Sequence, residues 1–239
     1  MKLEKILSVQ QYLKKEGLVK EYYKTSLFNF WKVSSVGHLK NFVREGLWTS
    51  YYETGMLKLK ENYKEGKLHD LYESYYENGN LEKRENYNLG QLVGGWEVYF
   101  ENGQLRKKGY YKNGKKFGVE ESFHQNGQLE FKTPYENGQI NGLNESYGEN
   151  GGLIYQMYFK DSNVVDGKYT TYYPSGEVYV VSHYKDGKVT GLETMYYKNG
   201  NLRARTRNEN GKRHGLSEYF DENGNLEDTQ MFSHDELVT

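Results

Sequence analysis

Apolar and polar residues alternate along most of this chain in short runs, and the runs recur with a fixed period. From Gly46 onward the same pattern returns every 24 residues, with one step of 25. The extra residue lies between Phe159 and Gly167, where K-D-S-N-V-V-D-G replaces the usual K-N-G-K-x-x-G. Alternation predicts strands and a fixed period predicts a repeat array. The glycines that mark successive hairpin turns are Gly55, Gly79, Gly103, Gly127, Gly151, Gly176, Gly200 and Gly224.

Three columns of the repeat keep their apolar character almost throughout. They begin at Tyr51, Leu57 and Tyr63, and the third is broken by Asn208. Because side chains alternate between the two faces of a strand, simple parity places these residues, together with Leu47, on one side of the first hairpin. We therefore predict an all-β fold: an elongated, single-layer antiparallel sheet of about eight 24-residue β-hairpin repeats, with these ladders as the core.

Two Asn-Gly pairs in one copy of the repeat indicate where its turns lie. In the stretch Gly95–Gly118, Glu101-Asn102-Gly103-Gln104 joins two strands, and Asn113-Gly114 leads into the next copy. Asn and Gly tolerate the positive φ of a type I′ turn, which suits a tight hairpin. The unpaired edge strands of such a sheet would allow two copies of the chain to pair edge to edge.

The first 35 residues depart from the repeat. Met1–Glu16 has apolar residues at helical spacing and predicts a short N-terminal helix, which either caps the first repeat or binds a partner. Phe28, Phe30 and Trp31 fit a degenerate first strand. We assign residues 1–35 to this helix and capping segment and 36–239 to the array. The array begins with a half repeat at 36–46, and full repeats start near 46, 70, 94, 118, 142, 167, 191 and 215.

Composition narrows the classes of function. Only 36% of residues are hydrophobic, yet 25 are Tyr, so tyrosine replaces much of the usual aliphatic core. The net charge of −1 gives no general attraction to nucleic acid, and none is expected as a partner. Cysteine is absent, which excludes disulfides and thiolate sites. No apolar run resembles a secretory signal or a membrane span, so we expect a cytoplasmic protein.

The repeat pattern G-x-x-x-x-Y-Y-x-x-N-G-x-L-x-x-x-x-x-Y-x-x-G-K-x-x-G resembles the MORN repeat in its bacterial variant. Glu193–Gly215 shows it well, and the resemblance covers about residues 36–236. It implies an elongated, twisted antiparallel sheet of successive hairpins. It also implies an interaction protein, because bacterial proteins built of this variant are often classed as antitoxin-like. Related repeats serve as protein-binding scaffolds or as phosphoinositide binders.

No catalytic constellation stands out, and we predict that the protein is not an enzyme. Gly109–Lys115 matches the spacing of a phosphate-binding loop, but Lys116 replaces the Ser or Thr that holds Mg²⁺, and a strand pattern follows instead of a helix. The six histidines show no metal-type pairing within one element, so we predict no metal site and no cofactor.

Candidate partner-binding residues lie at the columns that vary. By parity, three consecutive copies place six aromatics on the face away from the Tyr51 ladder. These aromatics are Trp48, Tyr52, Tyr72, Tyr76, Trp96 and Phe100. Clustered surface aromatics are typical of binding hot spots. The alternative is that the N-terminal helix or the edge of a twisted sheet covers them.

A row of arginines is the second candidate. Parity puts Arg203, Arg205 and Arg207 on that same face, where three guanidinium groups would suit carboxylates or phosphates. The alternative is a solvated strand face neutralised by nearby glutamates. Two functions follow: a non-catalytic scaffold that binds another protein, with a toxin as one such partner, or a repeat protein that binds anionic lipid or carbohydrate.

Overall fold

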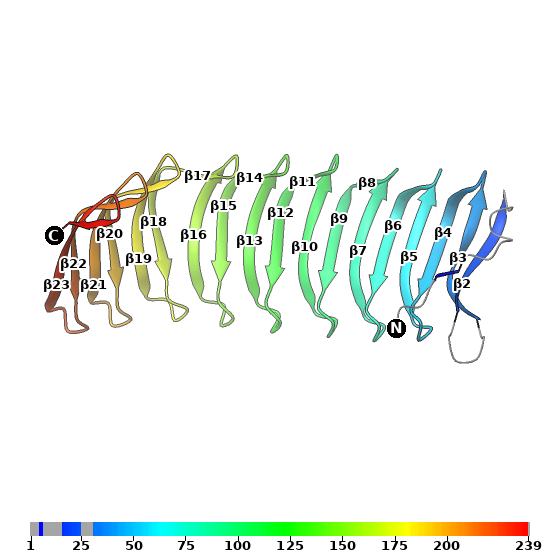
Figure 1. Ribbon diagram of the computed structural model, residues 1–239, viewed down its shortest axis with the longest axis horizontal. Coiled ribbons are helices and arrows are strands. Elements are labelled where there is room, and N and C mark those ends of the chain that lie inside the picture. Colours follow the sequence, from blue (N-terminus) through cyan, green and yellow to red (C-terminus); the bar gives the residue numbers. More distant parts are fainter. Residues whose placement is uncertain (1–4, 7–15, 25–30, 239) are drawn as a thin grey trace. The chain divides into compact units, whose positions relative to one another are not determined.

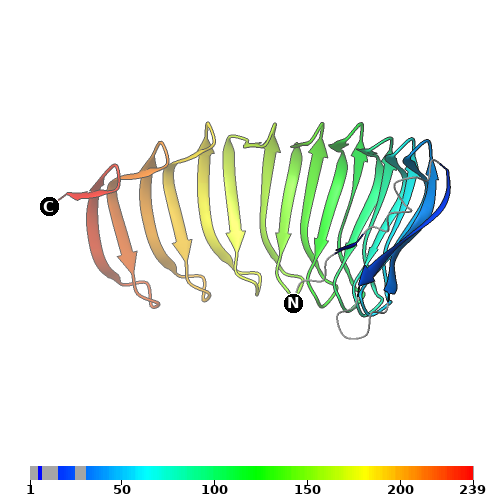
Figure 2. The same ribbon diagram turned by 45° about the vertical axis from the view of Figure 1, so that its right-hand side comes forward.

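The computed structural model describes residues 5–6, 16–24 and 31–238. Their regular structure consists of β-strands, and the chain divides into two compact units, Met1–Phe117 and Gly118–Thr239. In Figures 1 and 2, neighbouring strands within each unit run side by side in opposite directions. The prediction of an all-β, antiparallel sheet of hairpin repeats is confirmed.

The first unit is one antiparallel sheet in which consecutive long strands pair. Short strands β8 and β11 pair back onto β7 and β10 at the turns. The strands are β1 (Lys5–Ile6), β2 (Gly17–Lys24), β3 (Trp31–Lys40), β4 (Val43–Tyr51), β5 (Leu57–Lys64), β6 (Lys67–Tyr75), β7 (Leu81–Asn88), β8 (Gln91–Leu92), β9 (Gly94–Tyr99), β10 (Leu105–Lys112) and β11 (Lys115–Lys116).

The second unit repeats this arrangement. Fewer residues pair around the extra residue of the 25-residue step. There, strands β16 (Leu153–Lys160) and β18 (Gly167–Tyr172) are paired only through Tyr155 and Thr171. The strands are β12 (Gly118–Phe123), β13 (Leu129–Glu136), β14 (Gln139–Ile140), β15 (Gly142–Tyr147), β16 (Leu153–Lys160), β17 (Asn163–Val164), β18 (Gly167–Tyr172), β19 (Val178–Lys185), β20 (Lys188–Tyr196), β21 (Leu202–Glu209), β22 (Lys212–Phe220), β23 (Leu226–Ser233) and β24 (Glu236–Val238).

The predicted N-terminal helix falls mostly on residues 1–4 and 7–15, which lie outside the described part of the chain. Lys5–Ile6, the two residues of that segment inside it, form strand β1 and pair with Tyr22 and Tyr23 of β2. At these two residues the helix prediction is wrong. Of the residues proposed for a degenerate first strand, Phe28 and Phe30 also lie outside the described part, and Trp31 begins β3.

A β-bulge in each repeat hairpin decides which residues share a face. In the β4–β5 hairpin Tyr51 pairs with Leu57 but Ser50 pairs with Leu59, so the returning strand carries one extra residue. A bulge of this kind shifts the alternation by one. Tyr63 therefore lies opposite Gly46, on the face of Trp48, while Leu47, Tyr51 and Leu57 share the other face. The parity prediction that Tyr63 shares the Tyr51 face is wrong for this reason.

We call the face that carries Trp48, and its equivalents in later repeats, the inner face, and the opposite one the outer face. The inner face contains most of the deeply buried side chains, including Trp48, Trp96, Tyr169, Ala204 and Phe232. Aromatic rings of neighbouring strands meet on it. The centroid distances are 6.1 Å for Tyr72–Tyr87, 6.2 Å for Trp96–Tyr111 and 5.5 Å for Tyr169–Tyr184. The core is thus built on the inner face. On the outer face the Tyr51 ladder is half-buried, and so is the Leu57 ladder except for the exposed Val178 and Leu226.

The two turn types differ in conformation. Asn113 and Gly114 both have positive φ, 52° and 72°, as a type I′ turn requires, so that turn is confirmed. At the other turn only Gly103 has positive φ, 87°, and the side chain of Asn102 accepts a hydrogen bond from the backbone N–H of Gln104 instead. At this turn the asparagine stabilises the backbone through a local side-chain hydrogen bond.

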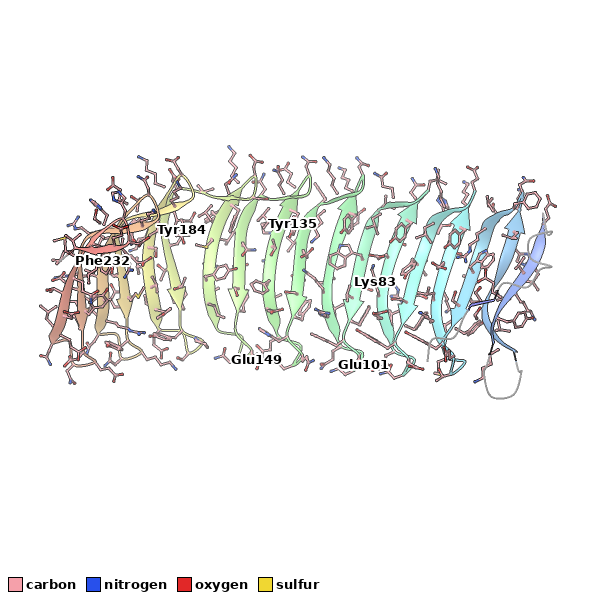
Figure 3. The ribbon with its side chains drawn as sticks, in the orientation of Figure 1. Lys83, Glu101, Tyr135, Glu149, Tyr184 and Phe232 are labelled. Atoms are coloured by element: carbon pink, nitrogen blue, oxygen red, sulfur yellow. The ribbon has the colours of Figure 1, made fainter. Side chains whose placement is uncertain are left out.

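Turn asparagines also join consecutive hairpins. The Asn78 side-chain amide donates to the carbonyl of Glu101 in the next hairpin at 2.9 Å, and Asn126 makes the same bond to Glu149 at 2.6 Å. Figure 3 labels both acceptor residues, each at the turn edge of its own unit. These bonds satisfy turn carbonyls and fix the spacing of the repeats.

Candidate protein-binding surface

Most of the six aromatic residues predicted to form a binding surface instead pack in the core or contact neighbouring repeats. Trp48 and Trp96 are only 2% and 8% exposed, and Tyr72 is half-buried beside Tyr87. The Trp48 indole N–H donates to the carbonyl of His38 at 3.0 Å. These three residues face away from the Tyr51 ladder, as predicted, but that face holds the core. With so little surface exposed, the two tryptophans cannot serve as surface anchors.

Tyr52 and Tyr76 hold neighbouring repeats together. The Tyr52 hydroxyl donates to the carbonyl of Tyr75 at 2.7 Å, and the Tyr76 hydroxyl donates to that of Tyr99 at 2.8 Å. Burial, and then the charge of Glu82, raise the pKa of both phenols, which therefore stay protonated donors at neutral pH. Tyr173 and Tyr197 make the same bond in the second unit. Phe100 occupies this position without a hydroxyl, with Arg106 over its ring at 5.8 Å.

The arginine row lies on the outer face, not on the face of the aromatic column. In the β20–β21 hairpin Arg205 pairs with Thr194, whereas the position equivalent to Trp48 is Glu193, opposite Thr206. The bulge again shifts the alternation, so the parity assignment is wrong. Arg205 is bound at both ends of its guanidinium by Glu218, with an Nη2–Oε1 distance of 2.9 Å. This contact lowers the pKa of Glu218.

The other two arginines are separate from that pair. The Arg203 guanidinium lies 5.7 Å from the centroid of the Tyr197 ring. The Arg207 side chain lies beside Gly215, 3.5 Å from where a Cβ atom on that glycine would be. The strand therefore does not present three free guanidinium groups in a row. The predicted anion-binding row is reduced to two exposed cations on either side of an ion pair.

The outer face instead carries a row of ion pairs across the strands. In the first unit Glu73 lies between Lys60, at 3.9 Å, and Arg84, at 3.1 Å, and Arg84 also reaches Glu97 at 3.4 Å. In the second unit Lys132 meets Glu145 at 3.4 Å, and Arg205 meets Glu218. Sequence analysis missed this row. Its signal was present as acidic residues at Glu73, Glu97, Glu121 and Glu145 and basic residues at Lys60, Arg84, Lys108 and Lys132, both spaced by 24.

Exposed aliphatic side chains lie on the outer face at the position of Leu47 in most repeats, whereas Gly95 and Lys168 occupy this position in two of them. Their exposure reaches 51% at Leu47, where a core leucine would be buried. The exposed members are Leu47 and Leu71 in the first unit and Val119, Leu192 and Leu216 in the second. In the second unit a shallow hollow, lined by Leu143, Tyr158 and Lys168 among others, opens on this face where β16 and β18 pair least. Exposed apolar rows of this kind mark interaction surfaces.

A separate cluster lies at the turns of the last hairpins. Glu209, His214 and His234 each offer a ligand atom, and these three atoms lie within 4.8 Å of one another. Sequence analysis missed the cluster because it searched for histidine pairs within single elements. The signal was the register of the array, in which positions 20 residues apart lie side by side on consecutive turns.

These features define a class of protein: a β-hairpin repeat scaffold with its core on one face and an aliphatic and ion-paired surface on the other. The family model of the MORN repeat variant matches the chain at residues 44–65, 71–89, 92–113, 118–137, 140–161, 165–186, 189–210 and 213–234. The chain therefore belongs to the MORN repeat variant family. Proteins of this kind are repeat scaffolds for binding proteins or lipids.

Other comparisons add little. None of the curated proteins compared with the chain matches it. Among solved structures the chain is similar to one titled "Crystal Structure of TcdB2-TccC3-Cdc42", at 14% identity and a TM-score of 0.22. The match covers 92% of this chain but only 14% of that one, so this chain spans a small part of its length. Within the described residues, no helix has the length and apolar character needed to cross a membrane.

Proposed function

We propose that this protein is a non-catalytic scaffold that binds another protein through the outer face of its sheet. The observation that carries the proposal is the set of exposed aliphatic side chains on the outer face of each unit, Leu47 and Leu71 in the first and Leu192 and Leu216 in the second, beside the ion pairs of the same unit. Most side chains of the inner face are packed in the core, so that face offers little surface to a partner. The outer face offers exposed apolar area beside charges that are mostly paired with one another, as in an interface whose apolar core has a polar rim.

Ion pairing favours a protein partner over anionic lipid. Lys60, Arg84, Lys132 and Arg205 all contact carboxylates, so binding a phosphate headgroup would first require breaking these pairs. Carbohydrate binding loses the aromatic platform predicted at Trp48 and Trp96, because both rings are buried in the core. The exposed rings of Tyr110 and Tyr158 on the outer face keep it as an alternative. Lipid or carbohydrate binding is the second candidate, and Arg203 and Arg207 are the exposed cations that would support it.

The finer proposal is that the bound protein is a toxin, which this chain neutralises in the cytoplasm. It rests on the resemblance to antitoxin-like proteins of the same repeat variant. A scaffold of this kind would act stoichiometrically, by covering the surface of its partner. No residue of the chain would take part in chemistry.

The test compares outer-face variants with a matched turn variant. Leu47→Asn/Leu71→Asn and Leu192→Asn/Leu216→Asn remove the aliphatic row in each unit. Leu89→Asn makes the same change at a residue 44% exposed on a turn tip, where φ is 47° and Asn is well tolerated. Partners retained by the wild type would be identified and purified, and their affinities measured by calorimetry.

We expect at least one double variant to weaken binding by about tenfold or more, because each interface leucine contributes on the order of 1 kcal/mol. Leu89→Asn should bind as the wild type does. Equal affinity for all variants would contradict the proposal. So would salt-sensitive binding of the wild type to anionic vesicles in place of a protein. If the purified partner arrests growth when expressed alone, rescue by the wild type but not by the double variants would support neutralisation.

A further inference from the structure

Three metal-ligating side chains from two successive hairpins converge at one edge of the second unit. Glu209 is the last residue of β21, His214 is the third residue of β22, and His234 begins the turn between β23 and β24. The Glu209 carboxylate lies 3.7 Å from His214 Nε2, and the two imidazole rings are 4.6 Å apart. One ligand atom from each residue falls within 4.8 Å of the others.

The fold holds these residues together through the backbone. Asp235 donates its N–H to the Arg213 carbonyl at 2.9 Å, and its carboxylate accepts the Arg213 N–H at 2.9 Å. These two bonds fix His234 beside His214, because each histidine is the neighbour of a bonded residue. Glu209 faces the same turn, since it pairs with Lys212 across the β21–β22 hairpin.

His214 departs from the role that its position has in three other repeats. In those repeats the side chain accepts a hydrogen bond from the backbone N–H of the following turn. Glu45 accepts from Glu65 at 2.8 Å, His69 from Leu89 at 3.3 Å and Asp166 from Asp186 at 2.7 Å. At His214 the Nδ1 atom is buried and has no hydrogen-bond partner among the described residues. The His214 ring is therefore not held by the backbone hydrogen bond seen at Glu45, His69 and Asp166, and its other nitrogen, Nε2, faces Glu209 at 3.7 Å, where it can bind a cation.

The donor set identifies the kind of cation. Two imidazoles and one carboxylate suit Zn²⁺ and related first-row divalent ions, whereas Mg²⁺ and Ca²⁺ prefer oxygen ligands only. Tetrahedral ligands at about 2.0–2.1 Å from Zn²⁺ lie about 3.3 Å from one another. The Glu209–His214 separation of 3.7 Å exceeds this value by about 0.4 Å, and all three ligand atoms lie within 4.8 Å of one another. Glu209 and His234 are exposed, so small side-chain rotations can close the site.

We propose that Glu209, His214 and His234 form a binding site for a divalent cation of the Zn²⁺ type, with a fourth position open. A bound ion would connect the β21–β22 hairpin to the turn that follows β23. It would therefore stabilise the last hairpins of the second unit. The site is independent of the outer-face surface described above.

Calorimetric titration of the full chain with Zn²⁺ tests the proposal. The key variant is His234→Asn, because Asn113, Asn137 and Asn210 occupy the same turn position with φ of 52–53°, so the turn should fold normally. Glu209→Gln and His214→Thr remove the other ligands; Thr190 holds the His214 position one repeat earlier. The matched control is His69→Thr, which removes a histidine at the same position in the first unit, where Leu89 stands in place of His234.

We expect one Zn²⁺ per chain, with the dissociation constant raised about 100-fold or more by His234→Asn and unchanged by His69→Thr. Loss of a mere second-shell partner costs 10–100-fold, and a direct ligand should cost no less. Zn²⁺ should also raise the urea midpoint of the wild type but not that of His234→Asn. Three results would overturn the proposal: absence of saturable binding, binding that survives His234→Asn, or binding that falls equally in His69→Thr.

Discussion

Gly109→Ala perturbs a close packing contact in the core of the first unit. In the register of β9 and β10, Gly109 lies opposite Trp96, and the indole occupies the space that a side chain at Gly109 would need. A Cβ at Gly109 would lie 2.8 Å from Nε1 of Trp96 and 2.9 Å from two ring carbons. The ring is buried and packs against Tyr111, so it has little room to move.

The expected cost combines two effects of opposite sign. Overpacking a core by one methyl group costs about 1–3 kcal/mol. Restricting the unfolded chain by a Gly→Ala change returns about 0.4–1 kcal/mol where the backbone conformation suits Ala, and Gly109 does not have positive φ. We therefore expect Gly109→Ala to lower the free energy of unfolding by about 1–2 kcal/mol.

The assay is urea unfolding followed by far-UV circular dichroism, with two comparisons. Gly95→Ala is the matched control, because its Cβ would meet only one atom, the Gly109 carbonyl oxygen, at 4.0 Å. It should be neutral or slightly stabilising. In a Trp96→Ala background, itself about 3–5 kcal/mol less stable, Gly109→Ala should lose its cost. An equal effect of Gly109→Ala in both backgrounds, or equal stability of the two glycine variants, would refute the packing argument.

Two further predictions concern the ladders that join the repeats. Tyr76→Phe removes the hydroxyl that donates to Tyr99 and should cost about 0.5–1.5 kcal/mol in urea unfolding, whereas Tyr110→Phe, which changes an exposed ring, should cost less. Burial alone would raise the pKa of Glu73, but hydrogen bonds from Tyr75 and Arg84 and the charges of Arg84 and Lys60 lower it overall. The stability this gives is present above the unfolded-state pKa of about 4.3 and is lost as pH falls through the lower folded value. Glu73→Gln should flatten the acid limb of the stability–pH curve, and an unchanged limb would contradict the assignment.

The architecture was predictable because it depends on period. Turn glycines every 24 residues and the Tyr51, Leu57 and Tyr63 columns specify successive hairpins whatever their detailed register. The type I′ turn at Asn113-Gly114 followed from residue type alone. The turn at Asn102-Gly103 did not, because its Asn bonds locally to the Gln104 amide instead of taking positive φ.

The prediction of which residues share a face of the sheet was wrong, because one extra residue in each hairpin shifts the alternation of the returning strand. A β-bulge next to Tyr51 is invisible in the apolar pattern, yet it moves Tyr63 to the inner face and Arg205 to the outer one. Trp48 could be placed correctly relative to Tyr51, on the same strand, but not recognised as core. Glycines opposite the tryptophans were the missed signal. An added Cβ at Gly37 would lie 2.2 Å from the Trp48 ring, so small and large residues were already matched across the strands.

Photo-crosslinking on the full chain tests most directly whether the outer face is the binding surface. A photoreactive amino acid would replace Leu71 or Leu216 on the outer face, or Leu89 on a turn tip, and the chain would be irradiated in the cells that produce it. We predict a crosslink to one protein from positions 71 or 216 and none from position 89. Crosslinks from position 89 alone, or to lipid in place of protein, would contradict the proposed function.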